Sequence, residues 1–275
     1  LLLCSKANSQ SYALAIDYIP VLNTYDFFLV FGGSDGSSIK LDNRGLIGEM
    51  EFIAFPGTVF SILEIIEFDD RNLKYYKVTT DEYQYKGDFY VDSRMVKTYF
   101  EKPNGRVIEK PNQPDVVKFM KSLIGYPYMW GGNYADGISK MLTYYKPKTE
   151  INEETKNLWT LKGVDCSGLL YQSTAGYTPR NTSSLLAYGE PVNIEDKPLE
   201  EIIPLLRPLD LIVIKGHVVI VLDENTAIES SPNKGVHTTE LKERLSKIME
   251  EHKPVNDFGK RMWKNKEFVI RRWML

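Results

Sequence analysis

Cysteine and histidine are both scarce in this chain. Its 275 residues include 2 cysteines and 3 histidines, and the net charge is −3. Two cysteines, Cys4 and Cys166, do not make a disulfide framework. The small net charge creates no overall basic field, which argues against a nucleic-acid partner. No apolar run reaches the length of a membrane-spanning helix, so none is expected.

The sequence also lacks the usual motifs that bind metal ions or phosphate groups. No cluster of histidine, cysteine and carboxylate residues has the spacing of a zinc site, and no glycine loop of the usual phosphate-binding types occurs. We therefore expect neither a metal nor another cofactor. With 43% apolar and 26% charged residues, the composition is that of a folded protein long enough to bury a sizeable core.

A short apolar stretch, Leu1-Leu2-Leu3, precedes Cys4. It resembles the end of a signal peptide, or a degenerate lipoprotein site at which Cys4 carries the lipid. We favour export, which predicts a location in the cell envelope or periplasm. The alternatives are a stretch with no targeting role and a cytoplasmic recycling enzyme.

Residues 12–105 are predicted to form a small β-barrel. Short aromatic and β-branched runs predict strands, and turn sequences such as Pro56-Gly57 and 69–72 separate them. The predicted strands are 21–22, 27–31, 52–55, 59–63 and 75–78.

Residues 106–275 are predicted to form an α+β domain. A polar, proline-rich linker ends near Pro114, where a helix is expected to run to Ile124. A second helix follows Cys166, and strands are predicted at 211–214, 217–222, 226–229 and within 264–273. Helices followed by an antiparallel sheet are typical of the α+β class.

The segment Gly163 to Leu170 places Cys166 directly before an apolar helical run. At the start of a helix, the positive end of the helix dipole favours the thiolate form of a cysteine. A thiolate is a nucleophile, and it needs a base to become catalytic. The alternative is a buried structural cysteine, so the residues around Cys166 must decide between the two.

His217 is the best candidate for this base. It opens a predicted strand, and the return strand after a turn reaches Glu229. A turn centred on Asp223 places His217 opposite Glu229, although a slip of one or two residues stays open. The Glu229 carboxylate would orient the imidazole. His237 is an alternative base or orienter, whereas His252 is expected on a charged, exposed helix.

Four segments in this order resemble the NlpC family of bacterial cell-wall cysteine peptidases, a branch of the papain-like fold. Gly125 to Gly132 resembles a Tyr-x-Trp-Gly-Gly segment, and Asp165-Cys166-Ser167-Gly168 matches the nucleophile motif. Pro179 to Ser183 resembles a Pro-Arg-x-x-Ser loop, and 206–218 resembles the strands that carry the catalytic histidine.

The resemblance implies a papain-like NlpC catalytic domain, 106–275, preceded by an SH3-like β-barrel domain, 12–105. It implies Cys166 and His217 as catalytic residues, with Glu229 at a third position that is commonly histidine. The substrate-binding residues implied are Tyr128, Trp130, Asp165, Ser167 and Ser183 in or near the catalytic domain, with Tyr90 and Glu49 or Glu51 in the N-terminal module. Tyr128 is also a candidate second donor to the oxyanion.

The implied activity is hydrolysis of the γ-D-glutamyl-diaminopimelate (or -lysine) bond in peptidoglycan stem peptides. The N-terminal module would read the free amine of an N-terminal L-alanine, which favours short peptides. Three alternatives stay open: hydrolysis of intact peptidoglycan during remodelling, a papain-like amidase or acyltransferase, and a wall-binding adaptor without catalysis. The connection from Gly132 to Asp165 is longer than is usual in the family, and it is a candidate cap for the groove.

Overall fold

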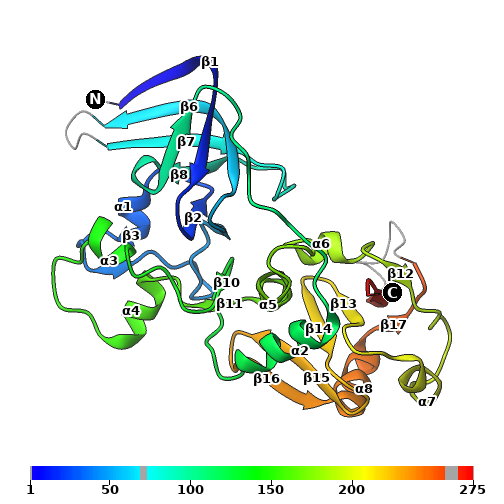
Figure 1. Ribbon diagram of the computed structural model, residues 1–275. Coiled ribbons are helices and arrows are strands. Elements are labelled where there is room, and N and C mark those ends of the chain that lie inside the picture. The colour runs from blue at the N-terminus through cyan, green and yellow to red at the C-terminus, as the bar shows by residue number, and fades with distance from the viewer. Residues whose placement is uncertain (1, 69–72, 258–265, 275) are drawn as a thin grey trace. The chain divides into compact units, whose positions relative to one another are not determined.

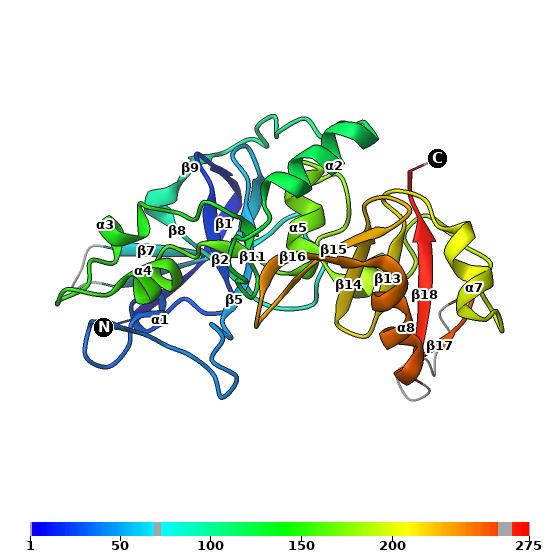
Figure 2. The ribbon, with the colours of Figure 1, turned by 90° about the horizontal axis from the view of Figure 1, so that it is seen from below.

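The computed structural model describes residues 2–68, 73–257 and 266–274, without the side chains of 2–10 and 68. Packing divides the chain into two compact units (Figures 1 and 2). Unit 1 comprises residues 1–107 and 129–163, and unit 2 comprises 108–128 and 164–275. Within the described ranges, no helix is long and apolar enough to cross a membrane.

Unit 1 is built on a seven-stranded antiparallel sheet of order β5-β2-β8-β7-β6-β1-β9. Its strands are β1 (Leu2–Ala15), β2 (Ile19–Leu22), β5 (Met50–Ala54), β6 (Val59–Phe68), β7 (Leu73–Thr79), β8 (Phe89–Asp92) and β9 (Val96–Tyr99). A 3₁₀ turn, η1 (Ser93–Met95), precedes β9. As far as the chain is described, β5 and β9 are the two edges and do not pair, so the closed barrel is not confirmed.

The N-terminal stretch lies in strand β1, where the backbone of Cys4 pairs with that of Ile66 in β6. The side chain of Cys4 lies outside the described residues, and so does the predicted turn at 69–72.

The prediction of a strand at 27–31 is wrong. The chain forms helix α1 (Phe27–Val30), and a two-residue strand β3 (Phe31–Gly32) follows and pairs with β4 (Ser38–Ile39). Asp26 caps α1, because its side chain accepts a hydrogen bond from the Leu29 N–H at 3.1 Å. Phe27, Val30 and Phe31 are buried while Leu29 is exposed, and this spacing is helical.

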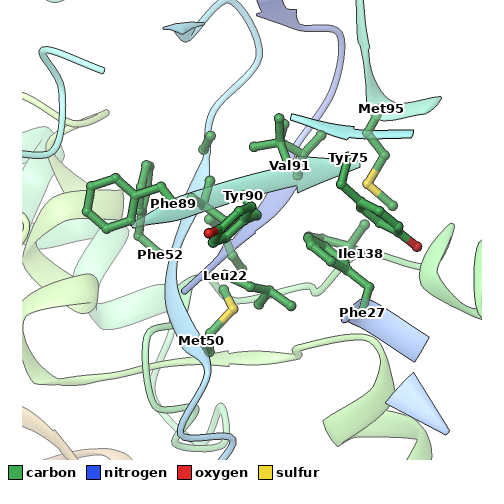
Figure 3. Packing of buried hydrophobic residues seen from close by; sticks show 14 of the residues in the cluster. Leu22, Phe27, Met50, Phe52, Tyr75, Phe89, Tyr90, Val91, Met95 and Ile138 are labelled. Atoms are coloured by element: carbon green, nitrogen blue, oxygen red, sulfur yellow. The ribbon is translucent and has the colours of Figure 1, made fainter. Parts of the chain in front are cut away.

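The connection between Gly132 and Asp165 belongs largely to the core of unit 1. It contains β10 (Asn133–Tyr134), α3 (Met141–Tyr144) and α4 (Glu153–Trp159), and ends in β11 (Gly163–Val164). Tyr145 and Trp159 are buried, and the Tyr145 ring stacks on that of Phe27 with centroids 5.8 Å apart. Figure 3 shows Ile138 of this connection packed beside Phe27 and Tyr75. These large side chains therefore stabilise unit 1.

Unit 2 contains helices and a mainly antiparallel sheet of order β12-β18-β13-β14-β15-β16, with β17 parallel to β18. The strands are β12 (Glu190–Pro191), β13 (Leu211–Ile214), β14 (His217–Val221), β15 (Thr226–Ser231), β16 (Gly235–Glu240), β17 (Lys253–Pro254) and β18 (Glu267–Arg272). The helices are α2 (Gln113–Ser122), α5 (Cys166–Ser173), α6 (Thr182–Leu185), α7 (Leu199–Ile202) and α8 (Leu241–Glu251), and a 3₁₀ turn, η2 (Ile203–Leu205), follows α7.

Most of the elements predicted for this half are confirmed. Asn112 caps α2 by accepting from the Asp115 N–H at 3.0 Å, and Pro114 lies in the first turn. The predicted strands are β13, β14, β15 and β18. His252 corrects one expectation: it is the C-cap of α8 and is half-buried, rather than exposed on the helix.

Helix α8 covers part of the sheet of unit 2. Leu241, Leu245 and Ile248 recur at helical spacing and share a buried cluster with Val221 and Ala227. Side chains alternate across a strand, so Glu229 lies on the face of Ala227 and His217 on the face of Val221. The two polar residues thus extend the face that α8 covers.

Candidate active site

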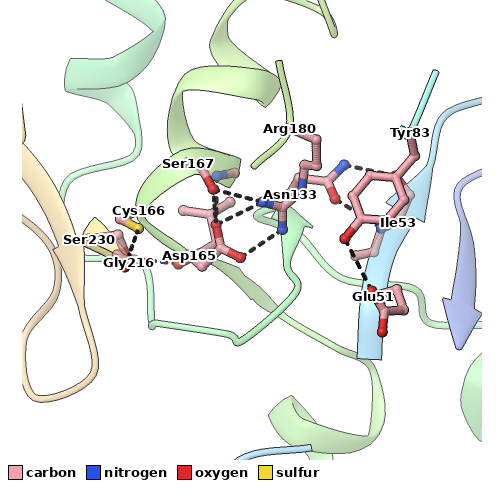
Figure 4. Close-up of polar contacts among 12 residues, drawn as sticks. Glu51, Ile53, Tyr83, Asn133, Asp165, Cys166, Ser167, Arg180, Gly216 and Ser230 are labelled. Atoms are coloured by element: carbon pink, nitrogen blue, oxygen red, sulfur yellow. Dashed lines mark hydrogen bonds and ion pairs between the residues drawn. The ribbon is translucent and has the colours of Figure 1, made fainter. Parts of the chain in front are cut away.

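Cys166 is the first residue of α5. The Asp165 carboxylate caps the helix by accepting from the Gly168 N–H at 2.6 Å. The Cys166 thiol is unpaired and mostly buried, with 6% of the residue exposed. Its sulfur lies 3.9 Å from the Gly216 carbonyl oxygen (Figure 4). The nucleophile predicted from the sequence is therefore at a helix N-terminus, directly beside the residue that precedes His217.

Two hydrogen bonds fix the segment that enters α5. The Ser230 hydroxyl donates to the Val164 carbonyl at 2.7 Å (Figure 4), and the Val164 N–H donates to the Pro127 carbonyl at 3.2 Å. Ser230 is fully buried on β15, one residue after Glu229. Strand β15 thus carries two residues of the site. Ser230 binds the backbone that leads into Cys166, and Glu229 binds His217. Sequence reasoning missed Ser230, since a strand serine carries no distinguishing signal.

His217 and Glu229 form a close pair. His217 Nε2 lies 2.5 Å from Glu229 Oε2. The carboxylate accepts the Nε2 proton, so Nδ1 is the ring nitrogen that remains for interaction with Cys166. The His217 side chain is 20% exposed and that of Glu229 is 4% exposed. This arrangement fixes the tautomer that a base facing a thiol requires.

The hairpin register predicted from the sequence needs a correction. The paired residues are Ile220 with Ile228 and Val221 with Ala227. In this register Glu229 lies opposite Val219, and it is the diagonal neighbour of His217 rather than its direct partner. The pairing slips by two residues because the turn is centred on Glu224 rather than on Asp223. An even slip keeps both side chains on the same face, which is why the pair survives it.

The electrostatics of the pair favour an imidazolium. Burial acts to lower the pKa of His217, but hydrogen bonds and charge interactions with Cys166 and Glu229 outweigh burial and raise this pKa to about 9. Burial acts to raise the pKa of Glu229, yet His217 and Arg244 lower it to about 2. Near neutral pH, Glu229 is therefore a carboxylate and His217 holds a proton that it can transfer.

Arg244 of α8 also binds Glu229. Its Nε lies 2.5 Å from Oε1 and its Nη2 lies 3.0 Å from Oε2. His237 of β16 is opposite Glu229 in the sheet, with Nε2 3.9 Å from Oε1, while its Nδ1 lies 3.0 Å from the Gly235 carbonyl. The sequence offered no signal for Arg244, because it stands among charged residues that are typical of a solvated helix face.

Asp165 and Ser167, which the resemblance assigns to substrate binding, lie in a second buried network. Arg180 makes a two-pronged contact with Asp165, at 2.9 Å to Oδ1 and 2.7 Å to Oδ2. Arg180 also donates to the Ser167 hydroxyl at 3.0 Å, and that hydroxyl donates to Asp165 (Figure 4). All three residues are buried. The network locks the first turn of α5 and so the position of Cys166.

Two further predicted residues lie in unit 2. Tyr128 is half-buried and follows Pro127, whose carbonyl accepts from Val164. Ser183 is exposed on the short helix α6. The substrate-binding roles of Tyr128 and Ser183 stay predictions.

The remaining predicted residues lie in unit 1. The Trp130 ring is 37% exposed, and Arg44 lies over it at 5.1 Å. Tyr90 is buried in β8, with its ring edge-on to Tyr25 at 5.8 Å. Burial raises the pKa of Tyr90.

The two acidic candidates flank Met50 in β5. Glu49 pairs with Lys40 at 2.5 Å. Glu51 accepts hydrogen bonds from the Tyr83 hydroxyl at 3.1 Å and the Asn23 amide at 3.0 Å. Leu22 of β2 pairs with Met50 on one side and with Tyr90 on the other. Tyr90 and the two glutamates therefore lie at the same level of the sheet.

Comparison with known proteins gives structural likenesses only. No protein-family model matches the chain, and no curated protein does. An NlpC/P60 family protein from Bacillus cereus is 16% identical, with a TM-score of 0.36 over 97% of this chain and 64% of its own. An NlpC protein from Trichomonas vaginalis is 12% identical, with a TM-score of 0.35 over 98% of this chain and 95% of its own.

A third likeness is to the P60 domain of an antigen from M. avium paratuberculosis. It is 21% identical, with a TM-score of 0.30 over 47% of this chain and 83% of its own. These identities and scores are too low to assign the chain to a family. The chain spans about two thirds (64%) of the length of the Bacillus cereus protein. Over the described residues, no group of three or more histidine, cysteine or carboxylate side chains is placed to hold a metal ion.

Proposed function

We propose that unit 2 is a papain-like cysteine peptidase domain of the NlpC type. The observation that carries the proposal is the constellation of a thiol at a helix start, an imidazole that interacts with it, and a carboxylate 2.5 Å from the far nitrogen of that imidazole. Nucleophile, base and orienter in this order are the parts that acyl transfer through a thioester requires.

The chemistry follows from the positions of the protons. The Cys166 thiolate attacks the amide carbonyl and forms a carbon–sulfur bond, and the carbonyl becomes an oxyanion. The backbone N–H of Cys166 lies in the first turn of α5, where helix N–H groups have no intrahelical acceptor, so it is placed to donate to that oxyanion.

His217 then acts twice. As an imidazolium it gives its Nδ1 proton to the leaving amine, and the carbon–nitrogen bond breaks to leave a thioester. As a neutral base it takes a proton from water, which attacks the thioester and releases the acid and Cys166. Throughout both steps Glu229 stays charged and holds Nε2, which keeps the ring in one orientation.

The substrate we propose is a peptidoglycan stem peptide, cleaved between γ-D-glutamate and diaminopimelate or lysine. The support is the resemblance of the segments around Trp130, Cys166 and Ser183 to wall peptidases, together with the Tyr90 and glutamate positions in a module that resembles SH3-type domains. Short peptides with a free N-terminal L-alanine are the preferred class. An envelope location, with Cys4 as a lipid site, belongs to the same proposal.

The test compares two substrates with one variant. Purified L-alanyl-γ-D-glutamyl-diaminopimelate and intact sacculi are each incubated with the protein and with Cys166→Ala, and products are identified by mass spectrometry. Release of diaminopimelate from the small peptide is expected, and the variant should release none. Products from sacculi alone would indicate a remodelling hydrolase, and transfer or amide products would indicate an acyltransferase or amidase. Release by Cys166→Ala would sink the assignment of the nucleophile.

A further inference from the structure

Arg244 lies outside the proposed catalytic set and contacts both carboxylate oxygens of Glu229. Among the residues that the structure describes, three charged or titratable side chains face this carboxylate: His217 from β14, His237 from β16 and Arg244 from α8. His217 holds Oε2, Arg244 spans both oxygens, and His237 approaches Oε1. Two parallel hydrogen bonds from the planar guanidinium of an arginine hold a carboxylate in one plane and one orientation.

A carboxylate at the third catalytic position has two difficulties. If the carboxylate were buried without a charged partner, its pKa would rise and it would take up a proton. It would then no longer attract the imidazolium. With His217 as its sole partner, its whole charge would stabilise the imidazolium, and the ring would give up its proton less readily. A second, permanent cation addresses both, because it keeps the carboxylate ionised and shares its charge.

We propose that Arg244 is a positioning residue of the catalytic site, which fixes the Glu229 carboxylate against Nε2 of His217 and divides its charge between two cations. This inference rests on the proposed function of the Cys166 and His217 pair. Arg244 does not reach the reacting atoms; it acts through Glu229. The Arg244 side chain is 21% exposed, so water can reach the position when the guanidinium is removed.

Two substitutions distinguish the effect of the two-pronged hydrogen bonding of Arg244 from the effect of its positive charge. Arg244→Lys keeps the charge and loses the planar fork, whereas Arg244→Gln loses both. We expect kcat to fall about tenfold or more in both variants with KM little changed, as happens when a group that orients a catalytic side chain is misplaced. In Arg244→Gln alone, the loss of a cation should raise the pKa values of His217 and Glu229, so both limbs of the pH profile of kcat/KM move to higher pH.

A second readout needs no peptide substrate. The rate at which iodoacetamide alkylates Cys166 at pH 5.5 is measured by mass spectrometry. A free cysteine is almost wholly protonated at this pH, so the rate reports a thiolate held by the imidazolium. We expect Arg244→Gln to slow alkylation about tenfold. If the wild type is alkylated in this way but cleaves no stem peptide, the proposed substrate fails while the role of Arg244 is still tested.

Controls distinguish positioning from support of the fold. Lys247→Gln on the same helix removes an exposed cation that pairs with Glu243, and its rates should match the wild type. Glu229→Gln with Arg244→Gln should be no slower than Glu229→Gln alone, because Arg244 acts through that carboxylate. Folding is followed by thermal unfolding, and Arg244→Lys serves if Arg244→Gln does not fold. Wild-type kcat, alkylation rate and pH profile in a folded variant would overturn the proposal.

Discussion

Arginines hold several buried carboxylates of unit 2 in forks, and two of these pairs, Asp165 with Arg180 and Glu229 with Arg244, have different surroundings. Asp165 caps α5 and binds Arg180, whose side chain is 3% exposed. Glu229 binds Arg244, whose side chain is 21% exposed, and also His217. In the first pair, Asp165 also accepts from the Gly168 N–H, and both residues bind the Ser167 hydroxyl. The second includes the titratable ring of His217, which also interacts with Cys166, the proposed nucleophile.

We therefore expect the first pair to contribute mainly to the stability of the fold and the second to contribute to the proposed reaction. Asp165 caps α5 and pairs with Arg180, so this arginine holds the first turn of that helix. In the proposed mechanism, the charge of Glu229 is divided between a permanent cation and one that must give up its proton, so we expect its arginine to affect the reaction. The same two side-chain types are thus expected to have different consequences, because His217 shares the Glu229 carboxylate with Arg244.

Removing the arginine of the first pair should have the largest effect on the fold. Arg180→Leu leaves Asp165 buried beside an apolar side chain, and we expect a loss of about 3–5 kcal/mol in the free energy of unfolding. Urea unfolding measures this loss. Arg244→Leu is the matched change in the second pair and should cost much less, since water reaches its position. Equal losses in the two variants would show that the comparison is wrong.

Removing the charge of the second carboxylate should have the largest effect on catalysis. Glu229→Gln is nearly isosteric, but a neutral amide stabilises the imidazolium less and does not fix the tautomer. We expect kcat to fall about 10²-fold, within the range for general acid–base groups, with stability changed far less than in Arg180→Leu. Steady-state kinetics with the stem peptide give kcat and KM separately. A variant with full kcat would remove Glu229 from the catalytic set.

The pH dependence of stability should also reflect the second pair. His217 has a pKa raised from 6.5 to about 9, so its stabilising contribution is complete below pH 6.5 and is lost as the pH rises through 9. Glu229 has a pKa lowered from 4.5 to about 2, so its contribution is complete above pH 4.5 and is lost as the pH falls toward 2. Both contributions are therefore complete between about pH 4.5 and 6.5.

Thermal unfolding across pH 2 to 10 checks this window. Glu229→Gln should flatten the curve below pH 4.5 and reduce the decline between pH 6.5 and 9, because it removes the partner that raises the pKa of His217. A curve that is unchanged in the variant would show that the pair does not contribute to stability.

Local sequence signals predicted helices α2 and α5 and strands β13, β14, β15 and β18 of unit 2, and they placed His217 near Glu229 despite a register error. A slip of two residues preserves the face of a strand, so the alternation of side chains was enough. The stretch 27–31 failed for the opposite reason. Its aromatic residues favour a strand, but the Asp26 cap and the burial of Phe27 and Phe31 on one side favour a helical turn.

Local sequence signals could not identify partners that lie far apart in the sequence. Arg244 and Ser230 look like ordinary surface and strand residues, and their roles depend on which elements the fold brings together. The same holds for Tyr145 and Trp159, whose place in the core of unit 1 has no local signal in the sequence. Local sequence patterns can indicate a candidate nucleophile and a candidate base, whereas the residues that hold them in place depend on tertiary packing.

Ser230 offers the smallest and most specific test of the comparison. Its hydroxyl is the link between β15, which carries Glu229, and the backbone that leads into Cys166. Ser230→Ala leaves the Val164 carbonyl without this donor, and we expect a loss of about 1–3 kcal/mol in unfolding free energy. Because Val164 keeps its N–H bond to Pro127, α5 should stay in place and kcat should fall only a few-fold. Ser246→Ala, a half-buried serine on α8, is the control. If Ser230→Ala lowers kcat as far as Glu229→Gln does, alignment of the cysteine with the histidine strand matters as much as the carboxylate itself.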